Sequence, residues 1–259
     1  MTGALAQTAG LARRSLVAVR REPLAWFPAV FFPLLLMAIF TGSFGQAPGR
    51  IPGFPPIRGF LDFAISGSVL QAALLIGTVA GTGLARDIEG GFFDRLVLSP
   101  VPRVAILVGH LAGSVALAVG LGAVFIGVGV AFGARVHGGA TGVLLVLLLS
   151  AVLALAMGGL GIFLALRTGS AEAVQGSFPL FFVLLFFSSA YFPRETMTGW
   201  FRDVADVNPI SHLVEGMRVQ IVEGMASGST LLGAAVGAGL AAVTLAASVL
   251  ALRRRLGGA

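Results

Sequence analysis

A group of charged side chains lies in residues 86–103, between two long apolar runs. Carboxylates and guanidinium groups there alternate with large apolar side chains. A helix over residues 92–98 would place its apolar side chains on one side, leave Asp94 and Arg95 available to a partner, and end before Pro100. The pattern therefore predicts a docking helix, and an ordinary solvated loop is the alternative that spacing alone leaves open.

Residue types exclude several kinds of catalytic site. All 17 basic residues are arginine, and the sequence contains neither Lys nor Cys. Thiol nucleophiles, thiolate metal sites, disulfides and Schiff bases are therefore excluded. The phosphate-binding loop of an ATPase needs a lysine that reaches the β- and γ-phosphates, so this chain has no such site of its own. We expect no cofactor in the chain.

The remaining candidates for chemistry are histidines and carboxylates. His110, His137 and His212 share no metal-ligand spacing, and no serine-hydrolase or zinc-protease motif occurs, so no metal site is expected. Asp203 and Asp206 lie near His212 and form the one outer cluster that a lipid-modifying membrane enzyme could use. An ATP-independent carrier would need internal repeats and a midplane binding site, and neither is evident.

Composition defines the elements that must position these residues. Of 259 residues, 57% are hydrophobic and 11% charged, against about 45–50% and about 25% in ordinary soluble domains. A bilayer core needs about 20 apolar residues per helix. We predict an all-α membrane protein with six transmembrane helices and a single domain over 1–259. The apolar runs cover residues 24–44, 61–85, 104–133, 140–166, 174–192 and 230–252.

Arginine distribution predicts the topology. Residues 4–22 mix apolar and basic positions, which suits an amphipathic helix in the membrane interface. With both termini inside, eleven arginines are cytoplasmic and six external, and the positive-inside rule favours this orientation. The arginines are scattered between apolar runs, so nucleic acid is not an expected partner. Asp62 is the only carboxylate within a predicted span, and we expect it at a water-accessible end.

The predicted topology places a second hydrophilic stretch, residues 193–229, on the external side of the membrane. Its apolar residues recur at intervals of three and four, which predicts one or two short helices broken at Asn208-Pro209. These helices could re-enter the outer leaflet.

Both hydrophilic stretches resemble those of the ABC-2 type transporter permeases, a family that includes drug and lipid exporter-like subunits of the doxorubicin-resistance type. The outer match runs from Phe192-Pro193 through Asn208-Pro209 to Glu215-Gly216-Met217-Arg218. The inner match is to that family's ATPase-coupling region, and it comprises Asp87, Glu89, Gly90, Asp94, Arg95, Leu96, Pro100 and Arg103. His110 departs from the family, where a Lys is frequent, and we interpret it as an interfacial packing residue.

The resemblance implies an exporter of the bacterial plasma (inner) membrane, with both termini cytoplasmic. Its implied partners are two separate ATPase subunits that carry ATP and Mg²⁺, a second copy or a sister permease, and membrane lipid. The implied substrate path, from the first, second and fifth spans, comprises Trp26, Phe27, Phe31, Gln71, Phe178, Phe182, Phe186, Ser189 and Tyr191. The implied external gate comprises Trp200, Asn208, Pro209 and His212.

The character of that path predicts the cargo. Most of its side chains are aromatic or apolar, which favours amphipathic drug-like or lipid cargo over a polysaccharide or teichoic acid. Rings that simply face lipid are the alternative that the sequence leaves open.

Overall fold

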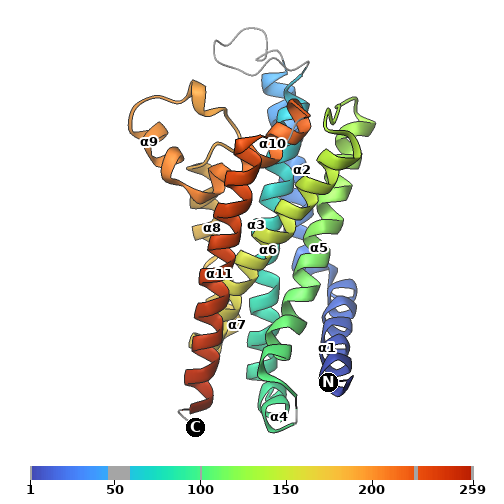
Figure 1. Cartoon of the computed structure of the whole chain (residues 1–259), viewed down its shortest axis with the longest axis vertical. Helices are drawn as coiled ribbons and strands as arrows, with labels where there is room; N and C mark the ends of the chain where they lie inside the picture. The colour runs from blue at the N-terminus through green and yellow to red at the C-terminus, as the bar shows by residue number, and fades with distance from the viewer. Residues whose placement is uncertain (1, 46–58, 100, 225–226, 258–259) are drawn as a thin grey trace.

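The computed structural model describes residues 2–45, 59–99, 101–224 and 227–257, and this part of the chain folds into helices and loops without strands. Five helices are long and apolar enough to cross a membrane. They form an elongated bundle, in which the N-terminus, α4 and the C-terminus lie at one end and α9 and α10 at the other (Figure 1). The five long helices are α2 (Pro23–Phe44), α3 (Phe60–Glu89), α5 (Arg103–Ala131), α6 (Gly139–Thr168) and α11 (Gly228–Gly257).

Helix α3 forms the centre of the bundle, because most of its side chains are buried against α2, α5, α6 and α10. It approaches α6 closely at two glycines. A Cβ at Gly77 would lie 2.1 Å from the Cβ of Met157, and a Cβ at Gly81 would lie 2.5 Å from the carbonyl carbon of Gly161. The two glycines thus permit the close contact between α3 and α6 at the centre of the bundle.

Shorter helices complete the fold at both ends. Helix α1 (Thr2–Arg21) occupies nearly the range 4–22 in which the interfacial helix is predicted, and it runs beside the end of α5 nearest to α4 (Figure 1). The contact is close, since a Cβ at Gly113 would lie 2.2 Å from the Oγ of Ser15. The position of α1 in the membrane interface stays a prediction. The other short elements are α4 (Phe92–Leu98), α7 (Ala171–Gln175), α8 (Phe178–Phe186), a 3-10 turn (Arg194–Thr196), α9 (Gly199–Val207) and α10 (Pro209–Val222).

The fifth apolar run differs from its prediction. Instead of one helix over 174–192, the chain forms α7 and α8, and α8 already ends at Phe186. Gly176 disfavours continuation of α7, and Pro179 is suited to the first turn of a new helix. The sixth membrane crossing therefore stays a prediction, because this segment is two short helices.

Candidate functional site

A helix is present where the docking helix is predicted, and it begins at a tight turn. Helix α4 covers Phe92–Leu98, the range that the sequence predicts, and Gly91 precedes it with a φ of 69° that favours glycine. Phe93 is buried, whereas Asp94 and Arg95 are exposed. The exposed pair can therefore meet a partner at this end of the bundle.

Two arginines from other helices contact the aromatic rings of α4. The guanidinium of Arg14 in α1 lies over the ring of Phe92, 4.2 Å from its centroid. The guanidinium of Arg255 in α11 lies 5.8 Å from the centroid of Phe93, and it donates a 2.9 Å hydrogen bond to the carbonyl of Leu166 in α6. Cation–π contacts therefore connect α4 to both terminal helices.

Asp87 is not exposed on a loop, because α3 extends to Glu89 and carries it into the bundle. Both of its carboxylate oxygens accept hydrogen bonds from Arg14, at 2.7 and 2.5 Å, and the Nε2 of His110 lies 3.3 Å away. The hydrogen bonds to Asp87 raise the pKa of Arg14. His110 is therefore more than a packing residue, since it contributes to this charged cluster.

The other predicted coupling residues have varied surroundings. Glu89 accepts a 2.7 Å hydrogen bond from the backbone N–H of Ala171, at the start of α7, and Gly90 ends α3. Leu96 is half-buried and Arg103 is exposed at the start of α5. Pro100 lies outside the described residues. A coupling role for these residues stays a prediction.

The predicted substrate path contains a continuous row of aromatic rings from α2 and α8. Phe27 stacks on Phe31 at 5.6 Å between centroids, and Phe31 contacts Phe32 at 5.8 Å. Phe32 reaches across to Phe182 at 6.1 Å. Phe182 contacts Phe178 at 5.0 Å and Phe186 at 6.0 Å, and Phe186 contacts Tyr191 at 5.5 Å. Hereafter we call these seven rings the aromatic row.

A polar pair lies at the end of the aromatic row. The hydroxyl of Tyr191 donates a 2.9 Å hydrogen bond to the Oε1 of Gln71, which is completely buried in α3. The Nε2 of Gln71 has no hydrogen-bond partner among the described residues. Trp26, in contrast, lines a separate pocket of about 170 Å³ beside Arg14 and His110.

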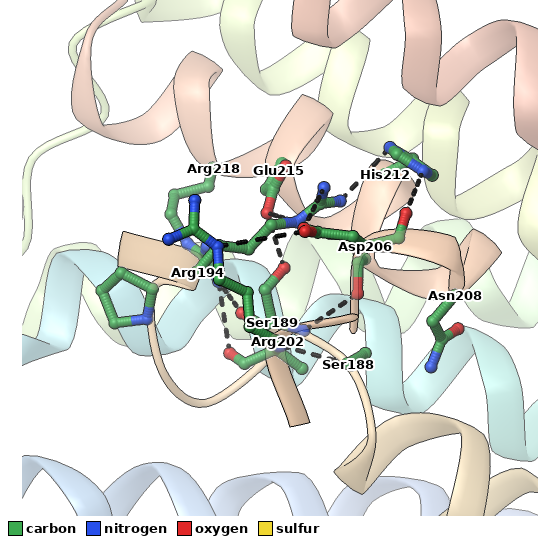
Figure 2. A network of polar contacts seen from close by, with 12 residues as sticks. Ser188, Ser189, Arg194, Arg202, Asp206, Asn208, His212, Glu215 and Arg218 are labelled. Carbon is green, nitrogen blue, oxygen red and sulfur yellow. Dashed lines mark hydrogen bonds and ion pairs between the residues drawn. The ribbon is translucent and has the colours of Figure 1, made fainter. Parts of the chain in front are cut away.

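Ser189 belongs to a polar network at the end of the bundle that carries α9 and α10 (Figure 1 and Figure 2), and it does not line the aromatic row. Its hydroxyl donates to Glu215 at 2.8 Å. Arg194 lies 2.5 Å from Glu215 and 3.2 Å from Asp206. The network therefore joins the segment after α8 to α9 and α10.

Two of the predicted gate residues, Asn208 and Pro209, lie where α9 and α10 join. Asn208 accepts a 2.9 Å hydrogen bond from the N–H of Ile210 and thereby caps α10, whose first residue is Pro209. The Nδ2 of Asn208 also donates to the carbonyls of Leu184 and Phe187, at 2.7 and 2.9 Å. The break predicted at Asn208-Pro209 is confirmed, and the same asparagine holds the end of α8.

The remaining residues of the predicted gate and of the predicted outer cluster have different surroundings. The His212 ring lies 3.2 Å from Arg194 and 3.1 Å from the carbonyl of Asp206, whereas Trp200 is 67% exposed. Asp203 is exposed on α9. Among the described residues, no three His, Cys, Asp or Glu side chains are grouped as a metal site requires.

Besides Asp87, two further charged residues are buried that the sequence placed near water. Arg218, counted as an external topology charge, is buried over the ring of Phe63, 3.7 Å from its centroid, and it donates to the carbonyl of Ser189 at 2.5 Å. Burial lowers its pKa to about 10. Arg218 lies eight residues after Ile210 on the apolar side of α10. This position is the sequence signal that could have indicated its burial. Asp62 was expected to meet water, but it is buried and accepts from the N–H of Arg135 at 3.0 Å.

The five long apolar helices among the described residues are typical of a polytopic membrane protein. The chain belongs to the ABC-2 type transporter family, whose model matches residues 6–222. It is 31% identical over 206 residues to the daunorubicin resistance ABC transporter permease protein DrrB1 of Streptomyces coeruleorubidus, covering 79% of this chain and 71% of that protein.

Two further relatives are more distant. The probable doxorubicin resistance ABC transporter permease protein DrrC of Mycobacterium tuberculosis is 23% identical over 233 residues, which cover 90% of this chain and 81% of that protein. The putative transport permease ycf38 of Porphyra purpurea is 25% identical over 211 residues, which cover 80% and 71%. The similarity thus extends over most of the chain.

Proposed function

We propose that this chain is the membrane-spanning subunit of an ATP-binding cassette exporter for amphipathic drug-like or lipid cargo. The observation that carries the proposal is the aromatic row, in which Phe27, Phe31 and Phe186 are about half exposed. Rings offer large apolar contact, and Tyr191 with Gln71 adds a polar handle. The names of two relatives, which refer to daunorubicin and doxorubicin resistance, support drug-like cargo.

A pocket beside the aromatic row offers cargo an access point. It measures about 710 Å³ and lies among α2, α3 and α8, where Phe178 belongs to both the pocket and the row. Thr78 and Thr82 place hydroxyl groups in the pocket wall. The ion pair of Arg86 with Glu22 adds charged groups to the lining. Cargo would enter here from the cytoplasm or the inner leaflet and leave along the rings.

Energy would come from two ATPase subunits that hold ATP and Mg²⁺ and dock on the exposed face of α4. Because Arg14 and Arg255 contact the rings of Phe92 and Phe93, movement of α4 would reach α1 and α11 together. A second copy or a sister permease would supply the other half of the path. In this arrangement both termini are cytoplasmic, in the bacterial inner membrane.

Copurification and transport test this proposal together. The tagged chain should copurify with an ATP-binding subunit, and the double variant Asp94→Ala/Arg95→Ala should weaken that association and slow efflux of an amphipathic dye about tenfold or more. Arg167→Ala is the matched control, because Arg167 is exposed at the end of α6 but lies outside α4. Wild-type efflux by the double variant, or the absence of any ATP-binding partner, would refute the proposal.

A further inference from the structure

A pocket of about 320 Å³ lies between the ends of α5 and α11, on helices that contribute nothing to the aromatic row. Its rim carries two arginines, Arg103 from α5 and Arg253 from α11. Its walls are apolar, formed by Val104, Leu107, Val249 and Leu252. The pocket thus combines positive charge with an apolar surface.

The two arginines are available for an anion. Both are exposed, and neither forms an ion pair with a carboxylate among the described residues. No acidic side chain lines the pocket. Arg103 is the first residue of α5, and Arg253 lies near the last residue of α11, so both occupy the ends of apolar helices that are long enough to span a bilayer. That is the depth at which lipid phosphates lie.

The apolar walls continue away from the charges. Val104 is 59% exposed, and Val108, one turn further along α5, is also exposed. On α11, Leu250 is exposed beside the lining residue Val249. A small soluble anion would use only the arginines, whereas an acyl chain would also cover this surface.

We propose that this pocket binds an anionic phospholipid, whose phosphate lies between Arg103 and Arg253 and whose acyl chain lies along the exposed Val104 and Val108. Basic pockets between transmembrane helices bind anionic head groups in this way. Guanidinium groups suit a phosphate, because they offer paired N–H donors. The lipid would join the start of α5, which directly follows the docking segment, to the end of α11, which contacts Phe93 through Arg255. This site is independent of the cargo.

The test uses the purified, delipidated full-length chain in a neutral detergent. Phosphatidylglycerol should raise the melting temperature and remain bound in native mass spectrometry, whereas phosphatidylcholine with the same acyl chains should do neither. The double variant Arg103→Gln/Arg253→Gln should lose the tightest-bound phosphatidylglycerol. The control Arg167→Gln/Arg254→Gln removes the same charge from exposed positions outside the pocket and should retain it.

Two further arms separate a lipid from a simple anion. Val104→Trp keeps both arginines but fills the apolar groove, so it should also weaken phosphatidylglycerol binding. Inorganic phosphate at millimolar concentration should give little stabilisation. Equal loss of lipid in the control, unchanged binding by Val104→Trp, or full stabilisation by phosphate alone would overturn the proposal.

Discussion

The guanidinium of Arg14 meets both carboxylate oxygens of Asp87, at 2.7 and 2.5 Å, across 73 residues of sequence. This contact joins α1 to α3 three residues before Gly90, at the start of the turn into α4. The same guanidinium lies over the ring of Phe92. One side chain of α1 therefore contacts both the end of α3 and the start of α4.

Replacement of Asp87 by Asn should loosen α1. The substitution keeps the shape but removes the charge, and it should cost about 1–2 kcal/mol of unfolding free energy, since Arg14 is half exposed and keeps part of its hydration. Hydrogen exchange should become faster in α1. Arg13→Gln is the control, because Arg13 is exposed on α1 and forms no ion pair among the described residues, and it should leave the exchange unchanged. Wild-type exchange in Asp87→Asn would show that the ion pair does not hold α1.

The stability cost of a Gly→Ala substitution where α3 contacts α6 should depend on the space around each glycine. Gly77→Ala would place a Cβ against the Cβ of Met157, and Gly81→Ala would meet the backbone of Gly161. Because neither neighbour can rotate away, each should cost about 1–3 kcal/mol. Thermal unfolding in detergent measures this. Gly120→Ala is the matched control.

That control distinguishes crowding from loss of glycine itself. Gly120 lies inside α5, and a Cβ there would meet no atom within 4 Å. Gly120→Ala should be neutral or stabilise the protein by up to about 1 kcal/mol through helix propensity. Equal melting temperatures for all three variants would contradict the close packing of α3 and α6.

Features that depend on local sequence could be predicted. Helix α4 covers the predicted residues 92–98, because Gly91 and the residues before Pro100 set its limits within a few positions. The break at Asn208-Pro209 follows equally from an N-cap residue and a proline. Both signals lie within one turn of the structure that they determine.

Features that depend on partners far away in the sequence could not be predicted from local patterns. Arg218 is stabilised by Phe63 and by the carbonyl of Ser189, in other segments of the chain. Asp87 looked like a loop residue, because its partners Arg14 and His110 lie 73 and 23 positions away in sequence. Charge counts treat such residues as solvated, and only tertiary packing shows that they are buried.

The protein should lose stability when the Asn208 side chain loses either its accepting oxygen or its donating Nδ2 group. Asn208→Ala removes the cap of α10 and the two bonds to the carbonyls of Leu184 and Phe187, and it should cost about 1–3 kcal/mol. Asn208→Asp keeps the cap, but a carboxylate cannot donate to those carbonyls, so this variant should also melt below the wild type. A wild-type melting temperature for Asn208→Asp would mean that the bonds to the end of α8 contribute nothing.

Phe182 occupies the middle of the aromatic row and should matter for transport more than for folding. It contacts Phe32, Phe178 and Phe186. If cargo lies on these rings, Phe182→Ala should weaken its binding by about 1–2 kcal/mol, which is roughly a 5–30-fold rise in the concentration for half-maximal efflux. Efflux of a fluorescent amphipathic compound from intact cells measures this.

Two further variants separate transport from stability and from contact with lipid. Phe182→Leu keeps most of the apolar volume, so it should fold like the wild type but still transport poorly, because the flat ring is missing. Phe132→Ala removes a ring that is 80% exposed just beyond α5 and outside the aromatic row, and it should not affect efflux. If Phe182→Leu and Phe132→Ala both transport normally, the aromatic row faces lipid and the cargo path lies elsewhere in the bundle.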